Sequence, residues 1–321
     1  MEGTNTNHQD VVAQIDVSQI CEAAKILRGG GLVAVPTETV YGLAADASNA
    51  GAVAAIYRSK DRPAFNPLIV HVADLQAAQG LAEFDETALK LAHAFWPGPL
   101  TLVLPLREGA PVTAAVTAGL PAIALRCPAH RVMNALLLES GLNLAAPSAN
   151  RSGHISPTCA AHVAAGLGDN APMILDAGAC ERGLESTIVA PRENGWQLLR
   201  EGPLTQDRIE AVLGTPATPL AGDRIEAPGQ LARHYAPRKP LRLNISEAKA
   251  GEWHIGFGAI AGDDNLSPSG DLDEAASRVF AALHRADASG KSSIAVAPIP
   301  ADGIGAAIQD RLKRAAAGAG R

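Results

Sequence analysis

The chain has 321 residues, of which 47% are hydrophobic and 19% are charged, enough apolar material for one large core or two smaller ones. Its formal net charge of −6 argues against a generally basic nucleic-acid-binding protein, although it allows a local basic groove. The four cysteines never form a C-x-x-C pair, so we expect reduced thiols and no zinc site. Residues 1–14 lack the apolar core of a signal peptide, and no apolar stretch approaches the roughly 20 residues that cross a bilayer. We therefore expect a soluble, cytoplasmic protein that makes no membrane contact.

The first part of the chain alternates helices and strands irregularly. We interpret residues 1–17 as an N-terminal arm, after which Ser18 is expected to cap the first helix. The three glycines 29–31 precede a strand, whereas a phosphate-binding loop follows one, so we interpret them as a turn. Neighbouring strands late in this part predict an α/β fold with a twisted, mixed sheet flanked by helices. The expected elements are helix 19–28, strand 32–35, helix 49–59, strand 67–72, helix 87–95, strands 100–106 and 122–126, helix 130–140, strand 142–146, helix 157–167, strands 173–176, 186–190 and 196–200, and helix 205–213.

The composition changes at Gly214. Residues 214–240 contain five prolines and no clear periodicity, which predicts a linker between a first domain, 18–213, and a second domain, 241–321. The second domain is expected to be a smaller, Rossmann-like α/β unit. Its expected elements are strands 241–244 and 254–258, helix 272–286, strand 293–298 and helix 304–316.

A dense polar cluster follows the first apolar strand. It consists of Thr37, Glu38, Thr39 and Tyr41. Strands that end in polar side chains are the usual way in which α/β proteins build small-molecule sites. The alternative is a strand end where threonines cap backbone groups and the tyrosine is half buried. Four such residues within five positions favour the ligand site.

Basic and amide side chains follow the next expected helix. Lys60 and Arg62 lie at its C-terminus, where the helix dipole alone already favours cations. The rigid turn at Pro63 holds them, with Asn66, near the next strand. A lysine point charge and a bidentate arginine suit an anionic, phosphorylated ligand. His71 ends that strand, and a histidine in this position is by itself more often a satisfied core residue.

Further polar groups lie at other strand ends. Segment 147–153, which includes Ser148, suits the close approach of a nucleotide or phosphate, but it fits a serine-rich turn equally well. Arg126, Ser186 and Arg200 also lie at the boundaries of expected strands. The sequence contains no P-loop, nucleophile-elbow or H-E-x-x-H motif. Chemistry here would therefore depend on positioning and charge stabilisation, and no general base is evident.

Several motifs occur in order along the chain: PTETVYGL, KDRP followed by NPL, HV, WPGPLTLVL, APSAN and ESTIV. Together they resemble the YrdC-like domain of the L-threonylcarbamoyladenylate synthases. The segment HYAP at 234–237 and the residues from there to the C-terminus resemble the two-domain branch of this family. The resemblance implies that L-threonine, bicarbonate and ATP give threonylcarbamoyl-AMP, pyrophosphate and water. The product would serve the formation of N6-threonylcarbamoyladenosine in tRNA.

The resemblance also implies roles for individual residues. Lys60 and Arg62 would be catalytic, with Lys60 close to the phosphates. The implied L-threonine pocket consists of Thr39, His71, Arg126, Ala146 and Ser186. The implied ATP site consists of Lys60, Arg62, Asn66, Ala122, Ser148, Ser156, Arg200 and Tyr235, the last acting as a lid from the linker. Mg²⁺ would be carried by the nucleotide, with no metal site on the protein. The implied partner is a separate tRNA threonylcarbamoyl transferase, with weak contact to tRNA itself.

Two other functions remain compatible with such a fold. An RNA-binding module without chemistry would not need the threonine pocket, whose residues are present here. A carbamoyl transferase for another acceptor, as in hydrogenase maturation, would carry acylphosphatase and zinc-finger regions that this sequence does not show. The second domain shows no catalytic cluster, and we expect it, together with the linker, to control ATP entry and product release.

Overall fold

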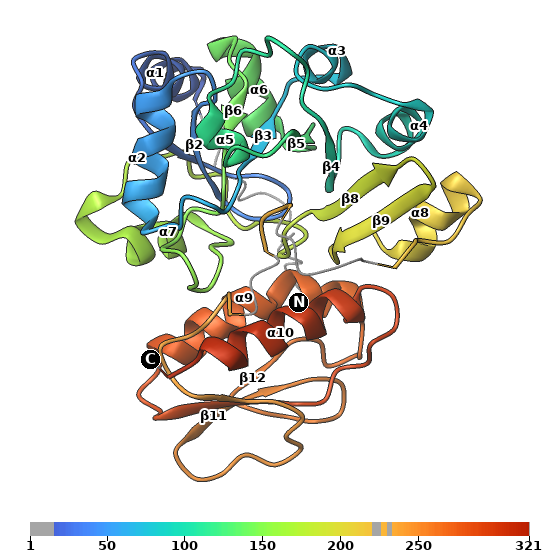
Figure 1. The fold of residues 1–321 in the computed structure, drawn as a ribbon. Helices are drawn as coiled ribbons and strands as arrows, with labels where there is room; N and C mark the ends of the chain where they lie inside the picture. Colours follow the sequence, from blue (N-terminus) through green and yellow to red (C-terminus); the bar gives the residue numbers. More distant parts are fainter. Residues whose placement is uncertain (1–15, 220–225, 230–232, 321) are drawn as a thin grey trace, which may run out of the picture.

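The protein is described by a computed structural model that covers residues 16–219, 226–229 and 233–320. Figure 1 shows two α/β units, one above the other. Helices α9 (Leu272–Ala288) and α10 (Gly305–Gly318) of the lower unit lie between its own sheet and the upper unit. Within the described ranges, no helix is both long and apolar enough to cross a membrane.

The first unit is built on a mixed sheet, as the sequence predicts. Its nine strands run in the order β7-β1-β2-β6-β3-β5-β4-β8-β9, with parallel pairs such as β3 with β5 and antiparallel pairs such as β4 with β5. The strands are β1 (Val33–Val35), β2 (Gly42–Asp46), β3 (Ile69–His71), β4 (Leu100–Pro105), β5 (Ala122–Arg126), β6 (Leu144–Ala145), β7 (Met173–Ile174), β8 (Thr187–Arg192) and β9 (Gly195–Arg200). The helices are α1 (Val17–Arg28), α2 (Ala50–Lys60), α3 (Leu75–Gln79), α4 (Glu86–Phe95), α5 (Ala114–Thr117), α6 (Arg131–Ser140), α7 (Ala160–Leu167), the 3₁₀ turn η1 (Gly168–Asn170) and α8 (Gln206–Leu213).

The start of the first helix differs from the prediction. Asp16, and not Ser18, caps α1, because its carboxylate accepts a hydrogen bond from the Ser18 backbone and Gln19 completes a capping box. The helix ends as expected, at the glycines: Gly29 is its C-cap, and Gly30 has a φ of 81° in the left-handed region. The three glycines therefore form a turn between α1 and β1.

A second difference concerns the polar cluster that follows β1. The chain does not leave the sheet there but returns as β2, which pairs antiparallel with β1 so that Val35 lies opposite Gly42. The sequence pattern hides β2 because its residues, GLAAD, are small and do not alternate in polarity. The polar cluster thus occupies the connection of a hairpin. Helix α7 also begins later than expected, at Ala160.

The second unit contains a small, fully parallel sheet, consistent with a Rossmann-like unit. Its strands are β10 (Leu241–Arg242), β11 (Glu252–Gly256), β12 (Asp264–Asn265) and β13 (Ser293–Val296), in the order β10-β13-β11-β12. The apolar cluster around α9 and α10 also includes Val40, Ile155 and Leu184 of the first unit and Tyr235 of the predicted linker. The two units therefore share apolar packing where they meet. Residues 1–15 of the expected arm, and 220–225 and 230–232 of the expected linker, lie outside the described residues.

Candidate active site

A polar cavity lies over the first sheet, where strand ends and the predicted linker meet. Ile69 and His71, two positions apart on β3, point to the same side of the sheet and both line it. The hairpin connection between β1 and β2 and the linker residues Gly229 and Tyr235 complete its walls. Its volume is about 50 Å³, room for a few water molecules. In this structure the cavity is therefore too small for a nucleotide.

Nine of the thirteen residues predicted for the site line this one cavity. They are Thr39, Arg62, His71, Arg126, Ala146, Ser148, Ser186, Arg200 and Tyr235. The other four, Lys60, Asn66, Ala122 and Ser156, are not among its lining residues. Ala122 begins β5, four residues from Arg126, so about 13 Å of extended strand separates it from the cavity end of β5.

Strand pairing brings His71 and Arg126 together, because these residues lie opposite one another in the parallel β3–β5 ladder. Arg126 forms an ion pair with Glu38, with 2.6 Å between Nη2 and Oε1, and both side chains are only 4% exposed. Its Nη1 donates a hydrogen bond of 2.9 Å to Thr39, and its Nε donates one to the carbonyl of Gly98. This arginine is thus held on three sides by the protein itself.

The charges on this side of the cavity follow from the ion pair. Burial alone would raise the pKa of Glu38, but the charge of Arg126 and its hydrogen bond outweigh burial and lower that pKa. Burial, and next the charge of Arg126, lower the pKa of His71 to about 3. At neutral pH, Glu38 is therefore ionised and His71 is neutral.

The polar cluster of the hairpin divides into two roles. Thr37 donates to the carbonyl of Val40 and accepts from the backbone of Thr39, and so it stabilises the connection itself. Tyr41 is fully buried and donates to the carbonyl of Gly178, as a core tyrosine does. Of the four predicted residues, Glu38 and Thr39 are the two that contact Arg126, through an ion pair and a hydrogen bond.

The opposite side of the cavity is richer in positive charge. Arg62 donates to the carbonyls of Asn66 and Pro67, and Arg200 donates twice to the carbonyl of Ser186 and once to its hydroxyl. Within the described part of the chain, neither guanidinium has an ion-pair partner. Burial lowers the pKa of both arginines to about 10, so both remain charged at neutral pH. Two buried cations without carboxylates are the mark of an anion site.

Unsatisfied polar atoms gather in the same region. The side-chain amide of Asn66, Nδ1 of His71, Nδ1 of His234 and the hydroxyl of Tyr235 are buried and find no hydrogen-bond partner among the described residues. A buried donor or acceptor without a partner costs about 1–3 kcal/mol, so natural proteins rarely leave several of them together. These atoms are suited to a polar ligand that enters the cavity.

Lys60 stands apart from the predicted phosphate contacts. Its side chain is 1% exposed, and its Nζ donates to the backbone carbonyls of Ser148 and Asn150. Burial, and then the nearby charge of Arg62, lower the pKa of Lys60 well below its ordinary value. In this structure Lys60 fixes the loop that carries Ser148, rather than facing the cavity.

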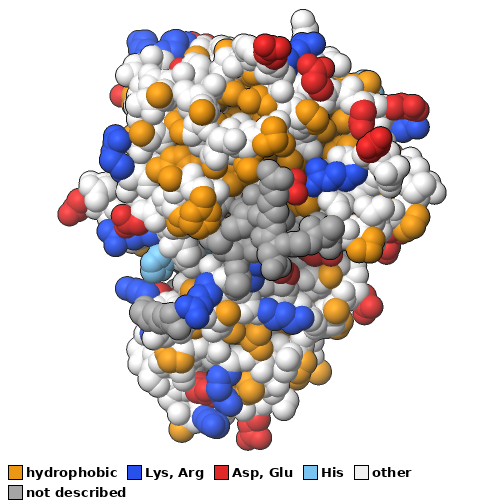
Figure 2. Space-filling model, in the orientation of Figure 1, with side chains coloured by type: hydrophobic (Ala, Val, Ile, Leu, Met, Phe, Trp, Pro, Cys, Tyr) orange, Lys and Arg blue, Asp and Glu red, His pale blue; other side chains and the backbone are white. Residues whose placement is uncertain are grey.

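A second, larger cavity of about 590 Å³ lies where the units meet, and it contains none of the predicted residues. Three arginines line it, but Arg238 pairs with Asp287 and Arg285 pairs with Asp264, which leaves Arg151 as the basic residue without an acidic partner within the described ranges. Figure 2 shows basic side chains and a histidine gathered at this boundary on the left of the view. Because its charges are mostly compensated, we place the candidate site in the smaller cavity.

Comparisons with known proteins show the family to which the chain belongs. A family model described as "Telomere recombination", for the Sua5, YciO and YrdC proteins, matches residues 25–202, and the model "Threonylcarbamoyl-AMP synthase, C-terminal domain" matches residues 204–317. The threonylcarbamoyl-AMP synthase of Bacillus subtilis is 40% identical, with 94% of this chain and 93% of the relative aligned. The chain belongs to the threonylcarbamoyl-AMP synthase family. A crystal structure of Pyrococcus abyssi Sua5 complexed with L-threonine superposes with a TM-score of 0.85 at 37% identity, covering 93% of this chain and 94% of that one.

The family also includes shorter chains. A putative threonylcarbamoyl-AMP synthase of Mycobacterium tuberculosis is 38% identical over 204 residues, which cover 63% of this chain but 93% of the relative. Such a relative is too short to contain both units. The second unit is therefore an addition that only part of the family carries.

Several lining residues were not among the thirteen predicted, and three of them matter for the argument below: Glu185, Gly229 and His234. Glu185 stands in the ESTIV motif beside the predicted Ser186, and His234 stands beside the predicted Tyr235, so both could have been found from their neighbours. Gly229 gave no signal, because a glycine in a proline-rich stretch is unremarkable. Within the described residues, no group of three or more His, Cys, Asp or Glu side chains is placed to hold a metal ion.

Proposed function

We propose that this chain converts L-threonine, bicarbonate and ATP to threonylcarbamoyl-AMP, pyrophosphate and water in the cavity described above. Members of its family are enzymes that transfer AMP, and the chain shares this activity. One observation carries the proposal. Arg62 and Arg200 are buried and have no carboxylate partner among the described residues, whereas the neighbouring Arg126 has one. The family evidence does not favour the alternative of an RNA-binding module.

The side of the cavity around Arg126 is proposed to bind L-threonine. Thr39, His71 and Ser186 supply polar atoms, and the small side chain of Ala146 leaves room for the threonine side chain. Arg126 suits the amino acid's carboxylate through its guanidinium. His71 is neutral, so its unpartnered Nδ1 can form a hydrogen bond with the amino group without repelling it.

The side around Arg62 and Arg200 is proposed to bind the phosphates of ATP. Asn66, Ser148, Ser156 and Tyr235 complete the proposed nucleotide site, and Ala122 would offer only backbone groups. Lys60 would act by holding the loop of Ser148 in place. Mg²⁺ is proposed to arrive with the nucleotide and to neutralise its phosphate oxygens.

The reaction proposed for this site has two steps. The amine of threonine attacks bicarbonate, a new N–C bond forms, and water leaves to give a carbamate. A carbamate oxygen then attacks the α-phosphate of ATP, and pyrophosphate departs. Each step brings negative charges together, which buried guanidinium groups stabilise before and during the transfer. Exclusion of water protects the carbamate and the mixed anhydride.

We further propose that the linker, residues 214–240, and the second domain, 241–321, control access to the first domain, 18–213. The cavity, at about 50 Å³, is too small for ATP, and its lining includes Pro228, Gly229, His234 and Tyr235 of this linker. Movement of the linker would open it. A chain truncated after Gly214 that kept unchanged ATP affinity and turnover would contradict this role.

The product is proposed to pass to a separate tRNA threonylcarbamoyl transferase. The net charge of −6 supports only weak contact between this chain and tRNA. ATP, bicarbonate, threonine and tRNA are all available in the cytoplasm, where we expect the reaction to occur.

Pyrophosphate release from ATP tests the proposed function. We expect release by the wild-type protein only when both L-threonine and bicarbonate are present. Arg62→Ala should lower it by about 10³-fold, as expected when one preorganised charge is removed from a transition state. Arg107→Ala is the matched control, because Arg107 forms an exposed ion pair with Glu83 away from the cavity.

Two results would contradict the proposal. One is pyrophosphate release by the wild type that does not depend on threonine. The other is ATP binding without any release when both co-substrates are present, which would leave the fold intact but assign another acceptor.

A further inference from the structure

Arg311 occupies a position in α10 where a charged residue is unexpected. Ile308, Leu312 and Ala315 recur with it at helical spacing and are all buried, so Arg311 lies on the apolar face of the helix. Its side chain is 0% exposed. Arginine is almost never fully buried unless it is paired, so this pattern already indicates a buried partner.

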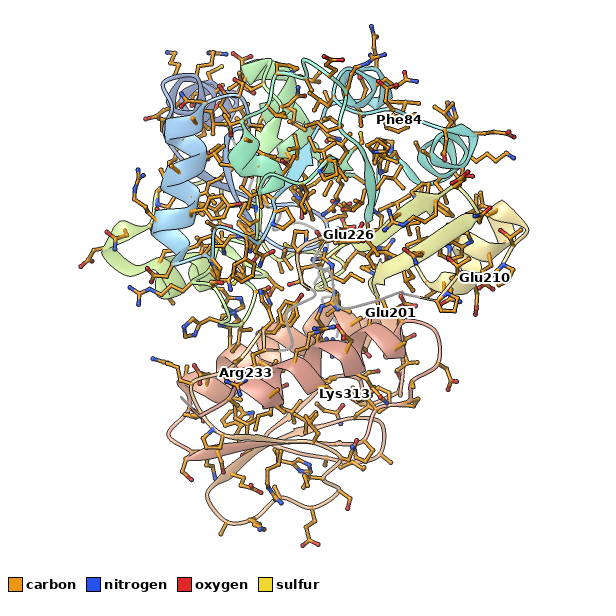
Figure 3. The ribbon with its side chains drawn as sticks, viewed as in Figure 1. Phe84, Glu201, Glu210, Glu226, Arg233 and Lys313 are labelled. Atoms are coloured by element: carbon orange, nitrogen blue, oxygen red, sulfur yellow. The ribbon has the colours of Figure 1, made fainter. Side chains whose placement is uncertain are left out.

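The partners of Arg311 lie mostly in the first unit. Its Nε lies 2.8 Å from Oε2 of Glu185, and its Nη2 donates a hydrogen bond of 2.8 Å to the backbone carbonyl of Glu201. Its Nη1 forms an ion pair of 2.8 Å with Asp310, its neighbour on α10. Figure 3 shows Glu201 beside α10 at the boundary between the units. The guanidinium thus crosses that boundary.

Glu185 connects Arg311 to the cavity. It lines the cavity, and its other oxygen, Oε1, accepts a hydrogen bond of 2.5 Å from the hydroxyl of Ser156. The backbone carbonyl of Ser156 in turn accepts a hydrogen bond of 3.1 Å from Nε2 of His284 on α9. The second unit therefore holds Ser156 from two sides, once directly and once through Glu185.

Arg311 also supports the ring of Tyr235. The guanidinium carbon lies 5.1 Å from the ring centroid, within cation–π range, and Phe280 of α9 packs against the ring at 5.5 Å. The backbone of Tyr235 has a φ of 63°, a left-handed conformation that is uncommon for a large side chain and needs support from its surroundings. Its hydroxyl is buried at the cavity and finds no hydrogen-bond partner in the described part of the chain.

We propose that Arg311 is a positioning residue of the active site, which fixes Glu185 with Ser156 on one side and Tyr235 on the other. The second unit then supplies part of the support for the nucleotide side of the cavity, in addition to any movement of the linker. This inference rests on the function proposed above. Arg311 does not line the cavity, and relatives too short to carry α10 belong to the same family, so it acts through other residues and is not itself catalytic.

Three variants of the full chain and one control test this role. Arg311→Met removes the guanidinium group, and Arg311→Lys keeps the charge but not the planar guanidinium. The double variant Arg311→Met with Glu185→Gln removes both members of the ion pair. Lys313→Met is the matched control, because Lys313 is exposed and lies two positions further along α10, on its opposite side (Figure 3). The measurements are the Kd for ATP by calorimetry, the KM for each substrate, kcat, and the melting temperature.

We expect Arg311→Met to weaken ATP binding by at least about tenfold, the effect of one or two displaced hydrogen bonds, with little change in the KM for threonine. Arg311→Lys should recover part of the ATP affinity, and Lys313→Met should match the wild type. Arg311→Met should also lower the melting temperature, because Glu185 is left buried without its partner. The double variant should recover the melting temperature while ATP binding stays weak.

Two results would overturn the inference. One is a folded Arg311→Met variant with the wild-type Kd for ATP. The other is a double variant in which melting temperature and ATP affinity recover together, which would make Arg311 only a partner for a buried charge. Failure of the proposed function would give a different result, because the wild type itself would then show no threonine-dependent pyrophosphate release.

Discussion

The two sides of the cavity treat their arginines differently. Arg126 has a buried carboxylate, Glu38, at 2.6 Å, and three protein groups hold it in place. Arg62 and Arg200 are equally buried, but backbone carbonyls and a hydroxyl are their only partners within the described residues. One side is therefore close to neutral without a ligand, whereas the other carries two uncompensated positive charges.

This difference indicates what each side can bind. A neutral side suits a zwitterion such as an amino acid, which brings no net charge and needs local hydrogen bonds. A side with two cations suits a polyphosphate, whose negative charges replace the missing carboxylates. The proteins of this family join those two kinds of substrate, and the division of charge within one small cavity matches that task.

The largest effect should follow from removing Arg126, on the side of the cavity where Glu38 balances its charge. Arg126→Met leaves Glu38 buried and unpaired, which we expect to lower the free energy of unfolding by about 3–5 kcal/mol. Threonine-dependent turnover should fall by about 10³-fold, because the guanidinium proposed to face the carboxylate is lost. Urea unfolding and pyrophosphate release measure the two effects. Adding Glu38→Gln to Arg126→Met should restore most of the stability and none of the turnover. If the Arg126→Met variant kept the wild-type KM for threonine, the proposed binding of the amino acid would be contradicted.

A smaller effect should follow from a conservative change on the cationic side of the cavity, which is the side around Arg62 and Arg200. Arg62→Lys keeps the charge but loses the planar fork that donates to the carbonyls of Asn66 and Pro67. We expect the KM for ATP to rise about 10- to 100-fold, equivalent to one or two charge-assisted hydrogen bonds. The KM for threonine should not change. If both KM values rose equally, the two sides of the cavity would not be separate binding sites.

The neutral histidine of the compensated side predicts a pH effect on stability. His71 has a pKa of about 3 in the folded protein against an ordinary 6.5, so between these values the unfolded chain binds a proton that the folded protein does not. Stability therefore falls as the pH drops through this window, by up to about 1.4 kcal/mol per pH unit. His71→Asn should make the fall shallower, as measured by urea unfolding at several pH values below 6.5. Identical slopes for variant and wild type would show that His71 is protonated in the folded protein.

Much of the fold and the cavity was predictable because it depends on local patterns. Apolar runs followed by polar residues predicted β1, β3 and β5, and the family resemblance placed Arg62, His71, Arg126 and Arg200 in one site. The mixed sheet followed from the irregular succession of elements. The order of its nine strands was not predictable, because it depends on pairings between residues far apart in the chain, such as β1 with β7.

The distribution of charge within the cavity could not be predicted for the same reason. Glu38 was part of the predicted cluster, but its partner lies 88 positions further on and meets it only through the hairpin of β1 with β2. The family resemblance implied that Lys60 lies close to the phosphates. Its side chain instead reaches the carbonyls of Ser148 and Asn150, which no local pattern indicates. Arg311 did leave a signal, a charge on the apolar face of a predicted helix, but the sequence does not say which carboxylate meets it.

The smallest expected effect on the cationic side of the cavity concerns Gly229. This glycine has a φ of 88°, and a Cβ atom added to it would lie 2.8 Å from Cδ of Arg200 and 3.0 Å from the hydroxyl of Tyr235. Gly229→Ala should therefore raise the Kd for ATP by about five- to tenfold, through displacement of these two side chains, and leave the KM for threonine unchanged.

Gly214→Ala is the matched control for this change. Gly214 has a similar φ of 71°, but nothing lies within 4 Å of its added Cβ, so it shares the backbone strain without the crowding. Both variants should lose about 1–2 kcal/mol of stability from the left-handed conformation. Only Gly229→Ala should affect ATP. Equal ATP affinities in the two variants would mean that the position of Arg200 tolerates this displacement, and the cationic side would then act through its charge rather than through its exact geometry.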